Sequence, residues 1–213
     1  MCCCFVWRIT ILVRGWPERL RMNVLIVYAH PNPRSFNQAI LHTLDAALRD
    51  RGHLTQTHDL YRMRFRAVLD SDDLNRNWRG EPAEDVRREQ ESVLWAQGLA
   101  FIYPIWWFGP PAILKGWIDR VFTRKFAFDF GAEGMKGLLT HERALILNTL
   151  GGDEASYHRQ DWHELLARPM TEGILRACGV HQVTYQAFYE VTGVTQMARR
   201  AMLKEVRVLA TAF

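Results

Sequence analysis

The stretch GLAFIYPIWWFGPPAILKGWIDRVF, residues 98–122, contains a strand, a loop and a helix in immediate succession. Residues 98–104 form a short apolar run, which is typical of a strand buried on both faces of a parallel sheet. Pro110 and Pro111 suit the first turn of a helix, which we expect to run to about Phe122. The loop between them carries three consecutive aromatic residues, although connecting loops are normally polar. These rings either complete the core or form a wall for a flat ligand.

The same alternation of strand and helix continues on both sides of this unit. Apolar or β-branched runs predict four more strands, at residues 23–29, 53–60, 143–149 and 181–189. Helical spacing of apolar residues, with glycine stop signals, predicts further helices at about residues 35–51, 83–97, 169–178 and 198–209.

The sequence allows more detailed predictions for some of these segments. Residues 61–82 are polar and contain glycine and proline breakers, so we expect them to be irregular. The charged helix that follows is expected to turn Val86, Val93 and Leu94 toward the core. Gly179 is placed to end the next-to-last helix.

Strands that alternate with helices predict an α/β fold with helices on both faces of a parallel sheet. Five strands favour a doubly wound five-stranded parallel sheet of the flavodoxin type, with strand order 2-1-3-4-5. In such a sheet, ligands bind beyond the carboxyl ends of the strands, near the point where the strand order reverses. The loops after the first, third and fourth strands lie there, and they are HPNPRSFN (30–37), PIWWFG (104–109) and TLGGDEASYH (149–158).

Composition indicates an ordinary soluble protein. The chain has 213 residues, of which 48% are hydrophobic and 23% charged, and its formal net charge is +4. Acidic residues are interleaved with this mild basic excess, so no nucleic-acid partner is expected. We expect residues 22–213 to form one domain, because no linker or repeat divides them.

The first 21 residues differ from the rest of the chain. They contain Cys2, Cys3 and Cys4, and the fourth cysteine, Cys178, stands alone. This spacing predicts neither a disulfide framework nor a zinc site, and it favours a reducing, cytoplasmic setting. We expect residues 1–21 to be a disordered extension or an over-long gene assignment. The alternative is lipidation of the cysteine cluster, which would create a membrane anchor.

The first of the three loops is suited to a phosphate group. A helix is expected to begin near Ser35, and the free N–H groups and positive dipole end of a helix N-terminus attract phosphate. Ser35 can cap or donate, Asn37 lies in the first turn, and Arg34 adds charge. No GxGxxG or GxxxxGK[ST] pattern is present, which argues against a standard nicotinamide-dinucleotide or nucleoside-triphosphate cradle. The alternative is ordinary helix capping next to a surface residue, His30.

The second loop is suited to a planar ring. Trp106, Trp107 and Phe108 can pack against such a ring, while backbone groups bond its polar edge. The alternative is that these side chains fill the core or a dimer interface, which are the commoner places for tryptophan.

The third loop adds backbone freedom and proton donors. Gly151 and Gly152 allow close approach of the backbone to a ligand. Tyr157 and His163 can donate protons or hydrogen bonds. A metal site made from Asp161, His158 and His163 has weak spacing, and we expect no metal.

A flat ring system with a phosphate tail describes a flavin nucleotide. In flavoproteins the cofactor supplies the hydride chemistry, and the protein supplies orientation and charge stabilisation. Reduction places negative charge on the pyrimidine side of the flavin ring. We expect Tyr157 and His163 to stabilise that charge.

Four stretches together carry a resemblance: LIVYAHPNPRSFN, YPIWWFGPPAILKGWIDRVF, TLGGDEASYH and GILRACG. From Met22 onward the chain resembles the NAD(P)H:quinone oxidoreductase family, which comprises DT-diaphorase and its bacterial relatives. The resemblance implies a flavin-dependent NAD(P)H dehydrogenase that reduces quinones two electrons at a time by a ping-pong mechanism. It also implies a homodimer with the pocket at the subunit interface.

The resemblance assigns catalytic assistance to Tyr157 and His163. It implies a substrate pocket formed by Trp107, Phe108, Phe128 and Phe130. Together with the residues argued above, the expected cofactor contacts are His30, Arg34, Ser35, Phe36, Asn37, Pro104, Ile105, Trp106, Trp107, Phe108, Thr149, Leu150, Gly151, Gly152, Tyr157 and Arg200.

The chain also departs from the family pattern. Phe128 and Phe130 stand where the mammalian enzymes have tyrosines, and Leu150 replaces a threonine. Arg199 or Arg200 is placed to meet an adenine-side phosphate, which favours FAD over FMN.

Three other functions fit parts of the sequence. An azo- or nitro-reductase would differ only in the electron acceptor. An ancillary regulatory subunit of a potassium efflux system would have a membrane transporter as its partner. A pure electron carrier is disfavoured, because it needs neither a substrate pocket nor groups such as Tyr157 and His163.

Overall fold

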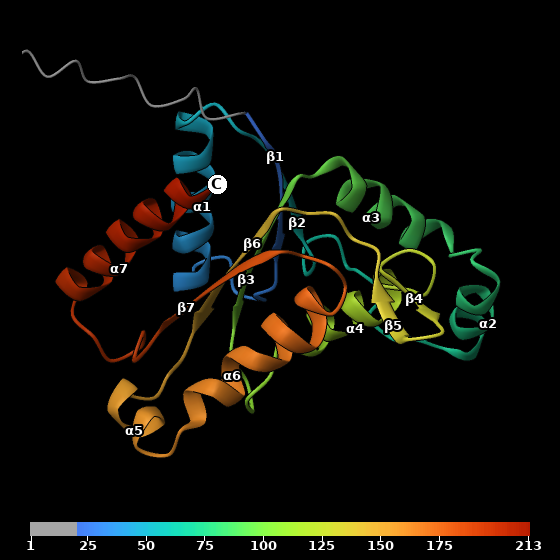
Figure 1. Ribbon diagram of the computed structural model, residues 1–213. Helices are drawn as coiled ribbons and strands as arrows, with labels where there is room; N and C mark the ends of the chain where they lie inside the picture. Colours follow the sequence, from blue (N-terminus) through green and yellow to red (C-terminus); the bar gives the residue numbers. More distant parts are fainter. Residues whose placement is uncertain (1–20) are drawn as a thin grey trace, which may run out of the picture.

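The computed structural model describes residues 21–213, and the expectations for residues 1–20, including the cysteine cluster, lie outside them. A parallel sheet forms its centre (Figure 1). Its strands are β1 (Asn23–Tyr28), β2 (Leu54–Asp59), β3 (Gly98–Pro104), β6 (Arg143–Thr149) and β7 (Gln182–Phe188). Their order is β2-β1-β3-β6-β7, so the predicted doubly wound order is confirmed.

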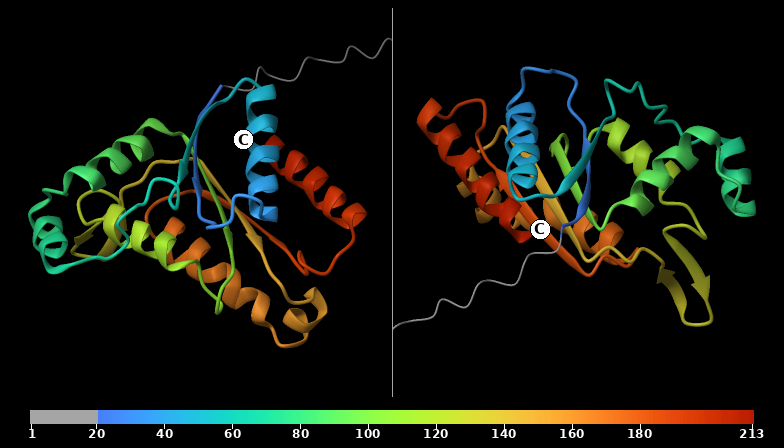
Figure 2. Two further views of the ribbon diagram at one scale, coloured as in Figure 1. Left: turned by 180° about the vertical axis from the view of Figure 1, so that it is seen from behind. Right: turned by 90° about the horizontal axis from the view of Figure 1, so that it is seen from above.

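Helices cover both faces of this sheet, as Figures 1 and 2 show. One face carries α1 (Phe36–Asp50) and α7 (Gln196–Leu209), which lie side by side. The other face carries α3 (Glu84–Trp95), α4 (Ala112–Val121) and α6 (Trp162–Met170).

The core therefore has two layers, one on each side of the sheet. Successive residues of a strand point to opposite faces. Leu25 and Val27 consequently pack in one layer with Trp117 of α4. Val24 and Ile26 pack in the other layer with α1 and α7. All seven residues of β3 are buried, because helices cover both of its faces.

The carboxyl ends of three strands meet at one edge of the sheet. Tyr28 pairs with Ile102, and Pro104 pairs with Thr149, so the loops after β1, β3 and β6 emerge together. The short helix α5 (Glu154–Arg159) lies beyond this edge, at the bottom of Figure 1. The reversal of strand order thus lies between the loops that the sequence singled out.

The prediction that residues 61–82 are irregular is wrong for the helix α2 (Ser71–Arg79). Asp70 and Asp73 form a reciprocal capping box at its start, and Gly80 ends it in the left-handed conformation. Arg120 of α4 is completely buried and donates to Asp73 at 2.9 Å and to Asp85 at 2.6 Å. This network fastens α2 and α3 to α4.

The prediction that Leu94 faces the core is also wrong, since 69% of its surface is exposed. The inward face of α3 instead carries two polar residues beside Val86 and Val93. One of them, Glu89, accepts a 2.7 Å hydrogen bond from the indole of Trp117. His58 bonds the same carboxylate at 2.7 Å. These partners make burial of the carboxylate tolerable and turn Leu94 outward.

The helix expected at residues 169–178 begins earlier than predicted. It starts at Trp162, contains Pro169 and continues as the π-helix η1 (Thr171–Arg176). Proline removes one helical N–H and crowds the preceding turn, and a wider turn follows it here. Gly179 then adopts a φ of +107°, which confirms it as the stop.

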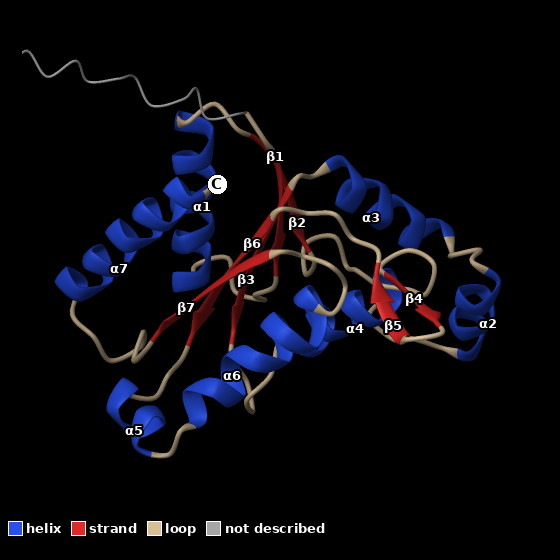
Figure 3. Ribbon diagram, viewed as in Figure 1, coloured by secondary structure: helices blue, strands red, loops and turns tan. Residues whose placement is uncertain are grey.

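The remaining elements lie away from the site edge. Strands β4 (Phe128–Gly131) and β5 (Gly134–Gly137) form a separate hairpin, visible at the right of Figure 3. A short 3₁₀ helix, η2 (Ala210–Ala212), follows α7. Within residues 21–213, no helix is long and apolar enough to cross a membrane.

Candidate active site

A cavity of about 770 Å³ opens at the carboxyl edge of the sheet. It is lined by the loop after β1, by the first turn of α1, by the ends of β3 and β6, and by the segment leading into α7. Eleven of the predicted contacts line it: His30, Arg34, Ser35, Phe36, Asn37, Pro104, Ile105, Trp106, Thr149, Leu150 and Gly151. The structure therefore brings the three loops together around one space.

The N-terminus of α1 forms one wall of this cavity. The Ser35 hydroxyl caps the helix by accepting from the backbone N–H of Gln38 at 3.2 Å. Other N–H groups of the first turn have no intrahelical acceptor, and the helix dipole adds positive potential there. This wall is suited to an anionic group.

His30 lies at the start of the same loop. Burial lowers the pKa of its imidazole below the usual value. Its Nδ1 accepts a 3.0 Å hydrogen bond from the backbone N–H of Asn32. The ring is therefore neutral near pH 7 and carries its proton on Nε2.

Asn37 links two of the loops from a buried position. Its Nδ2 donates to the hydroxyl of Thr149 at 2.7 Å. Its Oδ1 is buried and has no hydrogen-bond partner within residues 21–213. An unpaired buried acceptor costs about 1–3 kcal/mol, so a donor on a bound molecule or a water would stabilise this wall.

The aromatic loop is a two-residue turn with a strained backbone. Trp106 and Gly109 exchange backbone hydrogen bonds of 3.0 and 3.1 Å. Between them, Trp107 and Phe108 have φ values of 49° and 61°, in a region usually reserved for Asn and Gly. The exposed fractions of the three aromatic side chains are 44%, 97% and 41%. These rings therefore do not complete the core of the described chain.

Tyr157 packs against the tip of this loop. Its ring centroid lies 6.1 Å from that of Phe108, 5.9 Å from that of Trp162 and 5.6 Å from that of Tyr189. A Cβ on Gly152 would lie only 2.9 Å from the Tyr157 ring, so glycine permits this close approach.

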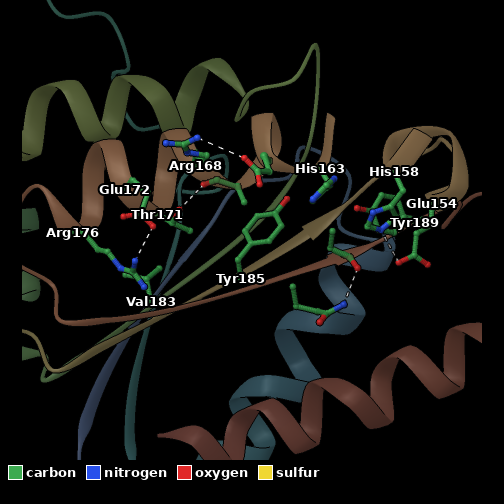
Figure 4. Close-up of a pocket in the computed structure, with 14 residues that line it drawn as sticks. Glu154, His158, His163, Arg168, Thr171, Glu172, Arg176, Val183, Tyr185 and Tyr189 are labelled. Atoms are coloured by element: carbon green, nitrogen blue, oxygen red, sulfur yellow. Dashed lines mark hydrogen bonds and ion pairs between the residues drawn. The ribbon is translucent and has the colours of Figure 1, made fainter. Parts of the chain in front are cut away.

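His163 lies elsewhere, in a second cavity of about 800 Å³ between β7 and the α5–α6–η1 segment (Figure 4). The two cavities share no lining residue, and Tyr157 lines neither. The ring of His163 lies 4.6 Å from that of His158, centroid to centroid. The structure thus places the two predicted catalytic residues near the same edge but not in one cavity.

Several other predicted residues lie outside the first cavity. Phe128 and Phe130 pack against each other in the β4–β5 hairpin, with centroids 5.7 Å apart. Arg200 is exposed, whereas its neighbour Arg199 lines the first cavity and donates to the backbone oxygen of Val191 at 3.0 Å.

Sequence reasoning missed three lining residues near α7, namely Val191, Thr192 and Gln196. No motif marks them. The one sequence signal nearby is Thr195, which marks the start of α7. Its hydroxyl caps that helix by accepting a hydrogen bond from the Ala198 N–H. Within the described residues, no three His, Cys, Asp or Glu side chains are grouped so that they could hold a metal ion.

Comparisons with known proteins agree on one family. The family model described as flavodoxin-like fold matches residues 22–209. An uncharacterized NAD(P)H oxidoreductase of Haemophilus influenzae is 32% identical over 86% of this chain and 91% of its own length. NAD(P)H dehydrogenase (quinone) 1 of Cavia porcellus is 33% identical over 78% of this chain and 68% of its own.

A solved structure gives the same result. NAD(P)H:quinone oxidoreductase from Methanothermobacter marburgensis superposes with a TM-score of 0.83 at 32% identity, covering 89% of this chain and 98% of that one. The chain therefore belongs to the flavodoxin-like family of NAD(P)H oxidoreductases that includes these quinone reductases.

Proposed function

We propose that this protein transfers two electrons from NAD(P)H to a quinone, with a flavin nucleotide held in the first cavity. The observation that carries the proposal is the position of that cavity. It joins the α1 N-terminus to the aromatic loop at the point where the strand order reverses. The names of the two quinone-reducing relatives support the same reaction class.

The residues that line the cavity fit a flavin nucleotide. The α1 N-terminus, with Ser35 and Arg34, would hold a phosphate. Ile105 and Trp106 would lie along the ring system, and a side chain at Gly151 would otherwise project into open space. The unpaired Oδ1 of Asn37 would accept a hydrogen bond. When bound, the flavin would supply the hydride-transfer chemistry.

The reaction needs a proton as well as a hydride. A quinone, NAD(P)H and one proton give a hydroquinone and NAD(P)⁺. Tyr157 would donate a hydrogen bond from its hydroxyl to negative charge that develops in the site, and His163 would deliver or hold a proton at its ring. Trp106, Trp107 and Phe108 would shield the reacting groups from water.

Arg199 supports FAD as the flavin. It lines the α7 side of the cavity, where its guanidinium could meet a second phosphate. Heat release of the cofactor, followed by chromatography, distinguishes FAD from FMN. Recovery of FMN alone from protein offered both would contradict this assignment.

We also propose that a second copy of the chain covers the aromatic loop. Trp107 is 97% exposed, and Phe130 on the hairpin is 59% exposed. Large exposed rings of this kind are typical of interfaces. Light scattering after size-exclusion chromatography should give the mass of a homodimer, and a monomer at micromolar concentration would contradict the proposal.

A visible spectrum tests the central proposal. The purified protein should show flavin bands that bleach with NADPH and return when a quinone is added. A protein that takes up neither FAD nor FMN would overturn the proposed function. An azo dye that reoxidises the reduced protein much faster than quinones would favour the azoreductase alternative, and co-purification with a potassium transporter would favour a regulatory subunit.

A double variant tests the assigned roles. Tyr157→Phe with His163→Gln should slow flavin reduction while the flavin stays bound, since neither residue lines the first cavity. Unchanged reduction by NAD(P)H would remove both residues from the mechanism.

A further inference from the structure

The tip of the aromatic loop lies against a residue that no sequence motif marks. The ring of Phe108 meets the indole of Trp162 edge-on, with the centroids 5.2 Å apart and the ring planes at 87°. Edge-to-face contact is a preferred geometry of aromatic pairs. In Figure 1 the loop after β3 ends beside α6, the helix that begins at Trp162. Among the described residues, Trp162 therefore makes the closest ring contact to this tip.

Trp162 also completes a triangle of rings. Its centroid lies 5.9 Å from that of Tyr157, and the centroid of Tyr157 lies 6.1 Å from that of Phe108. Tyr157 has further support, because its ring packs on Tyr189 at 5.6 Å and lies close to Gly152. Within residues 21–213, the ring of Phe108 pairs with Tyr157 and Trp162 alone. Loss of the Trp162 indole would thus free Phe108 more than Tyr157.

The two segments that meet in this triangle both have strained backbones. On one side, Trp107 and Phe108 have φ values of 49° and 61°. On the other side, Asp161 has a φ of 54° directly before Trp162, and its side chain makes no capping bond to α6. Residues other than glycine keep such conformations only where the surrounding structure holds them. The rings supply that hold at the point where the two segments touch.

The hydrogen bonds of the aromatic loop lie at its base. The backbone N–H of Ile105 donates to the Thr149 oxygen at 2.9 Å, and Trp106 and Gly109 exchange bonds of 3.0 and 3.1 Å. The two residues at the tip take part in none of these bonds. Ile105 and Trp106 line the first cavity. Movement of the tip would therefore reach the cavity wall through the bonds of the turn.

We propose that Trp162 is a positioning residue that holds the tip of the aromatic loop, through its contact with Phe108, in a fixed place beside the first cavity. The expected effect on quinone reduction rests on the proposed function. The effect on the loop itself does not depend on any cofactor.

Amide hydrogen exchange, followed by NMR of the nitrogen-15-labelled full-length chain, tests the positioning. The amides to follow are those of Trp106 and Gly109, which donate the two bonds of the turn. In Trp162→Leu they should exchange about two- to tenfold faster than in the wild-type protein, which corresponds to one lost aromatic pair. Circular dichroism should show the variant folded. Unchanged exchange of both amides in the folded variant would overturn the proposal.

The Ile105 amide separates positioning from a general loss of stability. It belongs to the sheet edge rather than to the turn, so its exchange should be the same in Trp162→Leu and in wild-type protein. Equal acceleration at Ile105 and Trp106 would overturn the proposal, because the effect would then be global. Leu165→Ala is the matched control on the same helix, since Leu165 is 57% exposed, and it should leave all three amides unchanged.

A conservative substitution tests whether the ring itself is needed. Trp162→Phe keeps an aromatic ring for Phe108 to pack against, so the exchange of the turn amides should stay within about twofold of the wild-type rates. Equal acceleration in Trp162→Phe and Trp162→Leu would show that the ring contact does not hold the loop.

Phe108→Leu tests the same contact from the loop side, where the side chain is 41% exposed and its loss is compatible with folding. It should accelerate the turn amides about as much as Trp162→Leu does. Adding Trp162→Leu to Phe108→Leu should have little further effect, because the contact is already lost. Unchanged amides in Phe108→Leu, or fully additive effects in the double variant, would overturn the proposal.

Kinetics separate this inference from the proposed function. In Trp162→Leu, KM for a quinone should rise about two- to tenfold with kcat within about twofold, since a looser wall weakens substrate binding while Tyr157 keeps its support. A lower kcat with unchanged KM would overturn the assignment of Trp162 to the loop. If the wild-type protein reduces no quinone but its turn amides depend on Trp162, the positioning stands and the proposed function fails. If activity is normal and the amides are indifferent to Trp162, the positioning fails alone.

Discussion

The side-chain amide of Asn37 donates a 2.7 Å hydrogen bond to the hydroxyl of Thr149, 112 residues further along the chain. It joins the first turn of α1 to the last residue of β6 and so fixes the distance between the α1 wall of the first cavity and the third loop. Both residues are buried, at 2% and 3% exposure, so water does not compete for this bond.

Asn37→Ala should therefore weaken flavin binding. The substitution removes the bond to Thr149 and the free Oδ1 acceptor, and two lost hydrogen bonds correspond to about 1–3 kcal/mol, or roughly fivefold to 150-fold in Kd. Equilibrium dialysis of the apoprotein against FMN and FAD measures the change.

Gln38→Ala is the matched control for that experiment. The Gln38 side chain bonds His42 on the exposed side of α1 and does not line the first cavity. Equal Kd values for Asn37→Ala and Gln38→Ala would show that the link to Thr149 does not shape the site.

The turn at Trp107 predicts opposite effects on stability and activity. At protein concentrations low enough to keep the chain monomeric, Trp107→Asn should raise the free energy of unfolding by about 0.5–1 kcal/mol, because Asn tolerates the left-handed backbone and the indole buries almost nothing within the single chain. The same change should lower kcat/KM for a quinone, since it removes part of the proposed wall. Urea titration and steady-state kinetics give the two values.

Trp78→Gln controls for the loss of any exposed tryptophan, since Trp78 lies on α2 and is 64% exposed. Its kcat/KM should match that of the wild-type protein. A drop in stability for Trp107→Asn would contradict the assignment of strain to this turn.

Arg120 should be the most costly arginine to remove. Arg120→Ala leaves the buried Asp73 with only the half-exposed Arg66 as a charge partner, and breaking a buried ion pair costs about 3–5 kcal/mol. Arg124→Ala, which breaks a partly exposed pair with Asp129, should cost far less. Urea unfolding monitored by circular dichroism compares them, and equal losses would argue against the buried network.

The same network makes stability depend on pH. Burial pushes the pKa of Asp73 upward, but bonds from Arg120 and Arg66 outweigh it, and the bond from Arg120 lowers the pKa of Asp85. Both folded-state values lie below the ordinary 3.8, so the unfolded chain binds more protons. This contribution is complete above the unfolded-state value and is lost as the pH falls through the folded-state values.

Asp85→Asn isolates part of that dependence. The variant should lose stability at pH 7 and show a shallower fall in unfolding free energy between about pH 5 and pH 3. Parallel curves for variant and wild type across this range would contradict the assigned pKa direction.

The sheet and its site edge could be predicted because their signals are local. Strands covered on both faces must be apolar throughout, and β3 shows this at each of its seven positions. Because the strands are parallel, their carboxyl ends share one edge, and the predicted strand order determined which loops meet at the point of reversal. Eleven predicted contacts consequently line one cavity.

The wrong and missing predictions have a different physical origin. Helix α2 is polar, and it is held by Arg120, which comes 47 residues after Asp73, so its hydrophobic pattern carried no signal. The sequence nevertheless contains the two residues of its capping box, Asp70 and Asp73, at the expected spacing. The inward face of α3 depends on His58 and Trp117 as partners of Glu89, and Arg199 reaches the cavity through the packing of α7 beside α1. No short stretch of the sequence signals such contacts between residues that lie far apart in the chain.

The contrast between two tryptophans gives this protein built-in optical probes. Trp117 is fully buried, whereas Trp107 is 97% exposed, so their emission should lie at the blue and red ends of the indole range. The chain has eight tryptophans, and a difference spectrum against Trp107→Phe isolates the red component. Arrival of a ligand or a second copy at the aromatic loop should quench or shift that component, while the blue emission continues to report on the intact core.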